Sequence, residues 1–293
     1  DYLTYENLGK MENKGFDAEV SYTKRFANGL KVNVKGNIGY NKNEVTDVKE
    51  LNRTSSGYYY PYRENGYSVG QQFGYVIDYS NGNGYYNSQD EIDNSGLRYS
   101  GATPRPGDFV YKDLNDDGSI DERDQAPIDK AKTLPTYAYG ASVQLEYKNF
   151  DFYVQLQGVS GQRAYYNGCG IFDNCYQGVY TDLHRKAWTA ERYAAGEQIA
   201  YPALTTGSSS SLQRNEFFYS KDDYWRVKNV VLGYTLPKRF TNKLKTNKIR
   251  LYVSGANLLT FTSLKFDDID PEQSSFSQYP VYRTFNIGLN LNF

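Results

Sequence analysis

The last nine residues constrain the fold of this chain more than any other stretch. From Phe285 to Phe293 every odd position is large and apolar, while the positions between them carry asparagine or glycine. Side chains of a β-strand point alternately to its two faces, so this strand has one apolar and one hydrated face. Strands of outer-membrane barrels finish in this way, on an aromatic residue at the membrane interface. A strand of a water-soluble sandwich also alternates, and stays the alternative.

The composition is compatible with a membrane barrel. The 293 residues have a formal net charge of -1, and no run of about 18 apolar residues occurs, which excludes a helical membrane span. A membrane strand needs only every second of about ten residues to be apolar, so the mean hydropathy of the sequence does not reveal it. The chain has 31 Tyr and 15 Phe, and both membrane-interface girdles and sugar-binding loops use tyrosine. The balanced charge and the lack of a basic stripe predict no nucleic-acid partner.

The same alternation recurs in pairs along the chain. Strands are predicted at residues 16–26, 30–41, 137–147, 150–157, 225–236, 249–257 and 285–293. Short turns at 27–29, 148–149 and 237–248 alternate with long connections at 42–134, 161–223 and 258–281. Barrels with tight periplasmic turns and long extracellular loops show this order. If Phe293 lies at the periplasmic end, the long connections face outside.

Three local patterns refine this prediction. Residues 71–79 are a further strand candidate inside the first long connection, and residues 181–194 are predicted to form one helix, with Leu183 and Trp188 on a shared face. In the strand at 225–236, Arg226 and Lys228 alternate in step with outward apolar residues. We therefore expect both charges at the outer end of that strand, above the hydrocarbon.

The sharpest local motif spans residues 113–124, with the sequence DLNDDGSIDERD. Oxygen donors stand at the first, third, fifth, seventh, ninth and twelfth places, namely Asp113, Asn115, Asp117, Ser119 through its backbone carbonyl, Asp121 and Asp124. A glycine at the sixth place allows the sharp bend of a calcium loop. An EF-hand ends on glutamate, so the shorter Asp124 makes this loop more like a dockerin loop. We expect a structural Ca²⁺ or Mg²⁺ ion here; an Asx-rich surface turn without an ion is the alternative.

Other residues are candidates for ligand binding, a disulfide or catalysis. Tyrosines in the first long connection are candidates for stacking on sugar rings, with packing between loops as the alternative: Tyr58, Tyr59, Tyr60, Tyr85 and Tyr86. Cys169 and Cys175 are expected to form a disulfide, and two free thiols are the alternative. Asp267, Asp268 and Asp270 resemble the paired carboxylates of a glycosidase only in composition, and His184 has no partner at ligand or triad spacing. We therefore predict no catalytic residues and no enzyme activity.

Several short motifs, in order, resemble those of the SusC/RagA family of TonB-dependent outer-membrane transporters. They are ENKGFD at 12–17, GDFVYKDLN at 107–115, AWT at 187–189, YWRVKNVVLGY at 224–234, SGANLL at 254–259 and DPE at 270–272, before the close on Phe293. Each motif is short, and their joint order along nearly the whole chain carries the signal. Asp270 then marks a loop-to-strand feature instead of a catalytic carboxylate.

The resemblance implies an all-β transmembrane antiparallel barrel of about 22 strands, plugged by an N-terminal domain. Residues 1–293 would be the C-terminal part of that barrel, without the plug, the TonB-contacting segment or the first strands. For the intact protein it implies import of a bulky nutrient, usually an oligosaccharide and in some members a peptide. It also implies location in the bacterial outer membrane, a SusD-like surface lipoprotein as lid, and energy from the TonB complex.

Two other classes of protein fit parts of the same pattern. A secreted, Ca²⁺-stabilised carbohydrate-binding β-protein would share the aromatic loops, but it would be soluble without detergent. A passive porin or adhesin would share the barrel wall and need no plug. We interpret the chain as a piece of a longer protein, because it opens on Asp1 and carries no signal peptide.

Overall fold

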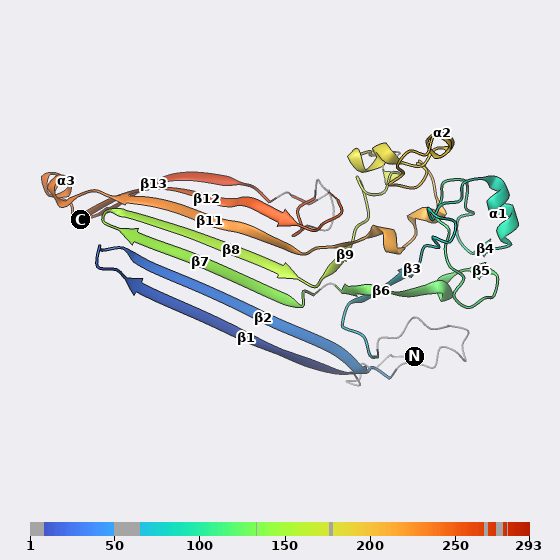
Figure 1. Cartoon of the computed structure of the whole chain (residues 1–293), viewed down its shortest axis with the longest axis horizontal. Coiled ribbons are helices and arrows are strands. Elements are labelled where there is room, and N and C mark those ends of the chain that lie inside the picture. Colours follow the sequence, from blue (N-terminus) through green and yellow to red (C-terminus); the bar gives the residue numbers. More distant parts are fainter. Residues whose placement is uncertain are drawn as a thin grey trace, which may run out of the picture.

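One twisted antiparallel sheet dominates the computed structural model, which describes residues 9–49, 65–132, 134–175, 178–266, 269–273, 278–279 and 281–293 (Figure 1). Its seven strands follow the order β1-β2-β7-β8-β11-β12-β13. They are β1 (Lys10–Arg25), β2 (Lys31–Asp47), β7 (Tyr137–Tyr147), β8 (Phe150–Ser160), β11 (Tyr224–Thr235), β12 (Lys248–Thr262) and β13 (Thr284–Asn292). All seven predicted strands therefore exist and pair with antiparallel neighbours. The sheet is open, with β1 and β13 as its edges.

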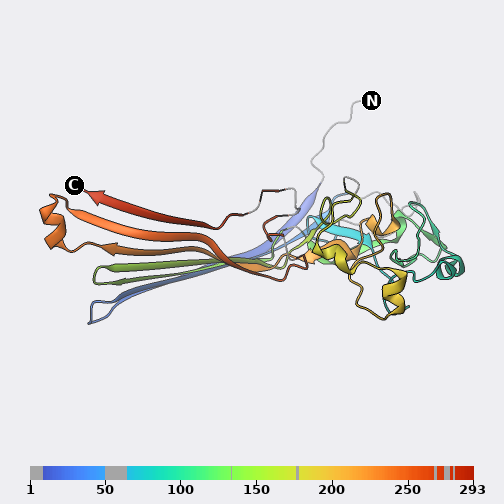
Figure 2. The ribbon, with the colours of Figure 1, turned by 90° about the horizontal axis from the view of Figure 1, so that it is seen from above.

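The short turns and the long connections lie at opposite ends of the sheet (Figure 2). Between β1 and β2, the Gly29 amide donates to the Phe26 carbonyl at 3.0 Å, and Gly29 has a φ of 89°, which glycine adopts at little cost. Between β7 and β8 only Lys148 and Asn149 turn the chain. The third connection differs from the predicted polar turn, because it contains helix α3 (Lys238–Lys243).

The two faces of the sheet differ in polarity as predicted. Large apolar side chains are exposed on the outward face, among them Phe16, Val20, Tyr22, Val34, Ile38, Leu232, Leu251, Val253, Phe285, Ile287, Leu289 and Leu291. The inward face carries cross-strand polar pairs. Asn229 donates to Gln155 at 2.8 Å, and the Lys31 ammonium lies 3.1 Å from the Glu146 carboxylate. Exposed apolar side chains therefore lie outward, and hydrogen-bonded polar groups lie inward.

Several boundaries differ from the prediction. β1 begins at Lys10 and β2 continues to Asp47, because each strand pairs with the other beyond the alternating segment. β12 continues to Thr262, through Asn257 at a φ of 54°. The candidate strand at residues 71–79 is shorter, and β3 (Gln71–Tyr75) pairs with β6 (Gln125–Lys132) outside the main sheet.

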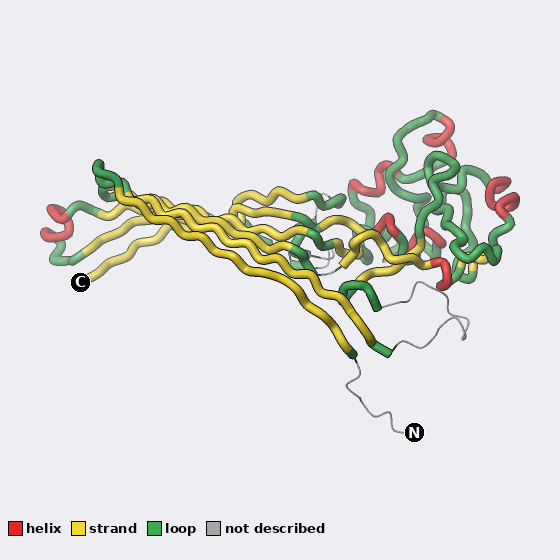
Figure 3. Tube along the Cα trace, turned by 60° about the horizontal axis from the view of Figure 1, so that its bottom comes forward, coloured by secondary structure: helices red, strands yellow, loops and turns green. Residues whose placement is uncertain are grey.

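The long connections fold into a second body at one end of the sheet (Figure 3). We call residues 65–132, 163–175 and 178–221, with Leu264, Phe266 and Ile269, the loop body. Besides β3 and β6, its described residues form β4 (Arg98–Tyr99), β5 (Ser119–Ile120), β9 (Arg163–Tyr165), β10 (Tyr219–Lys221), α1 (Gln89–Ser95), α2 (Ala190–Ala194) and 3-10 helices at Glu122–Asp124, Asp182–Lys186, Ser210–Leu212 and Glu216–Phe218. Its buried core is rich in aromatic residues, so this body has its own packing.

The single helix predicted at residues 181–194 is wrong. The chain forms a 3-10 helix at Asp182–Lys186 and then α2, with extended backbone between them. The Trp188 amide donates to the Tyr201 carbonyl at 2.8 Å, and the Thr189 hydroxyl accepts from the Arg192 amide at 3.2 Å as the N-cap of α2. Tertiary pairing at Trp188 therefore interrupts the helix. Among the described residues, no helix is both long enough and apolar enough to cross a membrane.

Candidate functional site

The loop body is held together by stacked aromatic rings, and it is the part of the molecule that carries most predicted site residues. The Tyr75 and Tyr111 rings stack with centroids 4.9 Å apart, and the Tyr85 and Phe109 rings with centroids 5.2 Å apart. Stacked aromatic pairs add to the stabilisation from burial itself. The end of β3 and the segment after it are thereby packed against the segment before β5.

The structure does not support sugar stacking by Tyr85 and Tyr86. Tyr86 is only 2% exposed, and Tyr85 is also buried. The Tyr86 hydroxyl lies 3.2 Å from the Tyr99 hydroxyl, and burial raises the pKa of Tyr99. Both rings pack the loops together, which was the alternative interpretation. The other three candidates, at positions 58–60, lie outside the described residues.

A buried carboxylate joins the two long connections. Asp108 is completely buried and accepts hydrogen bonds from the hydroxyls of Ser209 at 2.7 Å and Ser211 at 3.1 Å. The Arg105 amide donates to the same carboxylate at 3.1 Å. A buried charge needs such donors to be tolerated. Asp108 therefore fixes the position of one loop against the other.

The first half of the predicted cation loop is pre-formed. The Asp113 carboxylate accepts from the amides of Asp117 at 3.3 Å and Gly118 at 2.7 Å. Gly118 has a φ of 75°, as the sharp bend requires, and Ile120 at the eighth place is buried. Asp124 at the twelfth place accepts from the amides of Leu114 at 2.9 Å and Asp121 at 2.8 Å, which closes the loop.

The second half of the loop is engaged by an arginine. The Arg123 guanidinium lies 2.6 Å from the Asp121 carboxylate and 2.7 Å from that of Asp117. Hydrogen bonding to Arg123 lowers the pKa of Asp121, whereas burial raises the pKa of Asp124. In the described part of the chain, no three His, Cys, Asp or Glu side chains are grouped as metal ligands. The loop therefore has the predicted bend at Gly118, and Arg123 is the counterion of its Asp117 and Asp121 carboxylates.

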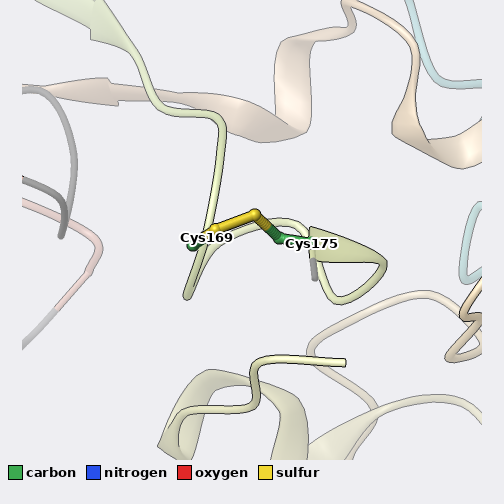
Figure 4. Close-up of a disulfide and its surroundings, with 2 residues drawn as sticks. All are labelled: Cys169 and Cys175. Atoms are coloured by element: carbon green, nitrogen blue, oxygen red, sulfur yellow. A yellow bond between two sulfur atoms is a disulfide. The ribbon is translucent and has the colours of Figure 1, made fainter. Parts of the chain in front are cut away.

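Cys169 and Cys175 form a disulfide in the second long connection (Figure 4). His184 lies nearby and is buried. Its Nδ1 accepts from the Thr181 amide at 2.9 Å, so its Nε2 carries the proton and donates to the Ile171 carbonyl at 3.2 Å. Burial lowers the pKa of this histidine. The ring is a neutral packing element, as the lack of partners in the sequence indicated.

The expected position of Arg226 on the outward face is wrong. Arg226 is completely buried, and its guanidinium forms ion pairs with Asp270 at 2.6 Å and Glu272 at 3.0 Å. A β-bulge between Val227 and Asn229 adds one residue relative to β8. Because one extra residue reverses the alternation, Arg226 faces inward although the even positions after the bulge face outward.

Trp225 confirms the direction of the strand before the bulge. It is exposed, and its ring stacks on that of Phe261 with centroids 4.3 Å apart. The pair therefore forms an aromatic patch on the outward face near the loop body. Of the three aspartates compared with glycosidase carboxylates, Asp270 belongs to the Arg226 ion pair, while positions 267 and 268 lie outside the described residues.

Where the loop body meets the sheet, a second buried carboxylate escaped sequence analysis. Asp222 is buried and accepts a hydrogen bond from the Tyr166 hydroxyl. Burial raises the pKa of Asp222 to about 7, and the neighbouring Asp223 adds to this effect. The hydroxyl groups that bind Asp222 and Asp108 lie more than fifty residues away in the sequence. No local spacing therefore revealed either role, although Asp108 stands in the motif at residues 107–115.

At the other end of the sheet, the inward face is hollow and charged. A cavity of about 630 Å³ lies near the hairpin between β7 and β8. It is lined by Gln144, Glu146, Lys148, Asn149, Phe150, Asp151, Thr235, Lys248 and Arg250. Such a lining suits a water-filled interior.

Comparison with known proteins matches this geometry. No family model matches the sequence. The chain is 27% identical to the TonB-dependent receptor P3 of Formosa agariphila, over 98% of this chain and 29% of that protein. It is 25% identical to the TonB-dependent receptor SusC of Bacteroides thetaiotaomicron, over 98% of this chain and 27% of that protein. The chain thus spans less than a third of the length of these relatives.

A solved structure described as the RagAB peptide transporter has the same fold, with a TM-score of 0.71 and 21% identity, over all of this chain and 30% of that one. The open seven-stranded sheet is therefore a partial barrel wall. Over almost all of its length the chain is thus similar in sequence to TonB-dependent receptors, SusC among them, and it shares the fold of the RagAB transporter, as its motifs predicted.

Proposed function

We propose that this chain forms part of the wall of a barrel in the bacterial outer membrane, with the loop body outside the cell. The observation that carries this proposal is the two-faced sheet, which is apolar outward and polar inward over seven strands. Lipid tails suit the outward face, and a hydrated interior suits the inward one. Receptors of the SusC/RagA type are outer-membrane proteins, which supports the same placement.

Membrane fractionation of cells that produce the intact protein tests this proposal. We expect the protein in the outer-membrane fraction, soluble only with detergent, and protease added outside to cleave within the loop body. Recovery of a monodisperse protein in plain buffer would instead favour the secreted carbohydrate-binding alternative.

For the intact protein we propose TonB-dependent import of a bulky nutrient, without catalysis. A SusD-like surface lipoprotein would cover the loop body, and energy would come from the TonB complex through the rest of the protein. The similarity to SusC and the order of the motifs support this role. The residues described above offer packing, ion pairs and a hydrated interior, which suit passage of a solute.

An oligosaccharide is the proposed cargo, and a peptide is the second candidate. The abundance of tyrosine favours a glycan. The burial of Tyr85 and Tyr86 removes two of the expected contacts, and the fold neighbour is described as a peptide transporter. Mass spectrometry of ligands that co-purify with the intact receptor and its lid would distinguish the two: hexose ladders support the first, and peptide mixtures the second.

We also propose that the loop at residues 113–124 binds Ca²⁺ in a structural role. The pre-formed bend around Asp113 and Gly118 supports this proposal. Carboxylate, amide and backbone oxygens are the ligands that this hard cation prefers. Arg123 would have to release Asp117 and Asp121 when the ion enters, so the ion and the guanidinium compete for the same carboxylates.

Isothermal titration of the intact protein with CaCl₂ tests the proposed ion site. Asp113→Asn and Asp117→Asn should each weaken binding by at least about tenfold, since each removes a charged ligand. Asp116→Asn is the matched control, because Asp116 lies in the same loop outside the donor pattern. Arg123→Gln should strengthen binding by removing the competitor. Equal uptake by all four variants would refute the site.

A further inference from the structure

The largest fully buried side chain among the described residues belongs to Arg226 of β11. Its Nε donates to the Thr260 hydroxyl at 2.9 Å on the neighbouring strand β12. Its Nη2 donates to both carboxylate oxygens of Asp270 at 2.6 Å, and Nη1 donates to Glu272 at 3.0 Å. Hydrogen bonds from all three guanidinium nitrogens fix the orientation of the group as well as its distance from the two carboxylates. One wall residue thereby binds two residues of the connection between β12 and β13.

Neighbouring side chains reinforce this attachment. The Tyr224 hydroxyl donates to the second oxygen of Glu272 at 2.6 Å, and the Lys228 ammonium lies 3.9 Å from Glu272. The Glu272 amide donates to Asp270 at 2.9 Å, so the two carboxylates are also fixed to each other. Two wall cations thus face two carboxylates of the connection, which leaves the group electrically balanced.

The same connection is anchored a second time, in the loop body. Leu264, Phe266 and Ile269 belong to its buried core, and the Phe266 ring packs edge-on against Tyr166 with centroids 5.1 Å apart. Residues 269–273 therefore run between an apolar anchor in the loop body and an ionic anchor on the inward face of the wall.

We propose that residues 269–273 form a strap, clamped by Arg226, that crosses the inward face of the wall at the mouth of the barrel and narrows the entrance. That residues 269–273 lie at the entrance of a transport barrel rests on the proposed function. The contacts between the strap and Arg226 do not depend on that function. The strap cannot lift without leaving a buried guanidinium unpaired, which is costly. The clamp therefore holds the strap against the inward face of the wall.

Proteolysis of the intact receptor in detergent tests the clamp. Arg226→Met keeps the length of the side chain but removes its charge and its donors. A protease of broad specificity should then cleave within residues 269–273 at least about tenfold faster than in the unchanged protein, because local opening exposes the strap. Arg250→Met is the matched control: it breaks the Arg250–Asp151 ion pair on the same face, between strands only, and should leave this cleavage rate unchanged.

Labelling of an introduced cysteine tests whether the strap covers the inward face. Gln157 of β8 is the register partner of Arg226, so a Gln157→Cys side chain lies beside the clamp. A bulky maleimide should label it at least about tenfold faster with Arg226→Met than without it. With Arg250→Met the labelling rate should not change.

Two results would overturn the strap: cleavage and labelling at the original rates in Arg226→Met, or equal acceleration by Arg250→Met. If Arg226→Met fails to fold, the double variant Asp270→Asn with Glu272→Gln alters only the connection and should give the same two accelerations. Neither measurement needs cargo or TonB. A failed import assay would therefore refute the proposed function and leave the strap standing.

Discussion

At the scale of single residues, an ion pair and an aromatic ring on the inward face each lie directly over a glycine of a neighbouring strand. The Arg250 guanidinium of β12 meets the Asp151 carboxylate of β8 across β11, where the residue is Gly233. A Cβ at Gly233 would overlap both charged groups. The Tyr252 ring likewise covers Gly288 on β13. A larger residue at either position would prevent the contact that lies over the glycine.

Gly233→Ala should therefore destabilise the protein by about 1–3 kcal/mol, because the methyl group displaces the ion pair that lies over it. Denaturant unfolding in detergent measures this change. Gly36→Ala on β2 is the control, since a Cβ there meets no atom within 4 Å, and its stability should stay within about 0.5 kcal/mol of the unchanged protein.

Asp222 should make the stability of the loop body depend on pH. A carboxyl group with a higher pKa in the folded than in the unfolded chain binds more protons when folded. The stability that it contributes is fully present below its unfolded pKa of about 4. It is lost as the pH rises through its folded pKa of about 7.

Asp222→Asn keeps an oxygen for the Tyr166 hydroxyl but cannot ionise. We expect the unchanged protein to lose melting temperature between pH 5 and pH 8 relative to this variant. Thermal melts of the two proteins at both pH values, followed by tyrosine fluorescence, measure the difference. Parallel curves would show that Asp222 does not contribute to the pH dependence.

At the scale of elements, one extra residue in β11 decides which side chains face the interior. The bulge at Lys228 lets Trp225 near the loop body and Leu232 beyond the bulge both face outward. Without it, the segment that carries Arg226 would turn its ion pair outward. The bulge therefore allows the apolar side chains of β11 to face outward while Arg226 faces the connection that it binds.

Deletion of Lys228 should lower the yield of folded protein several-fold, because it forces either Trp225 inward or the ion pair out of place. Lys228→Ala keeps the bulge, and should change stability by less than about 1 kcal/mol. The fraction that migrates as a compact barrel in unheated gels measures both. A folded deletion variant would mean that neighbouring strands can shift by one residue.

At the scale of the whole molecule, no second layer of the described structure covers the outward face of the sheet. Ile287 of β13 is 87% exposed, and the apolar row continues through Leu289 and Leu291. Such a surface is stable in lipid and unfavourable in water. The membrane is thus a structural component of the proposed fold.

Adjacent substitutions in β13 separate the two faces. Leu289→Arg in the intact receptor should cost about 2–4 kcal/mol of folding free energy in a bilayer, because it places a charge in hydrocarbon. Asn290→Arg faces the hydrated interior and should cost less than about 1 kcal/mol. Folding titrations into lipid vesicles measure both. Equal costs would contradict the assignment of the outward row to lipid.

The wall strands, their hairpin turns and the two faces were predictable from the sequence alone. They depend on a period of two and on turn residues such as Asn28 and Gly29, which are local properties. The ordered motifs also predicted the receptor type that the comparisons support. The expected disulfide and the ordinary role of His184 agree with the structure as well.

Only the tertiary structure decided the inner arrangement of the loop body and the direction of Arg226. Tyr85 packs in the aromatic core, and Asp108 accepts hydrogen bonds from serines of the other long connection. The partners of both are distant in sequence, so local residue spacing does not predict these contacts. A single bulge reversed the alternation that had placed Arg226 outward. Local periodicity determines which face a strand presents, whereas long-range pairing determines which buried groups meet, because only folding brings distant donors and acceptors together.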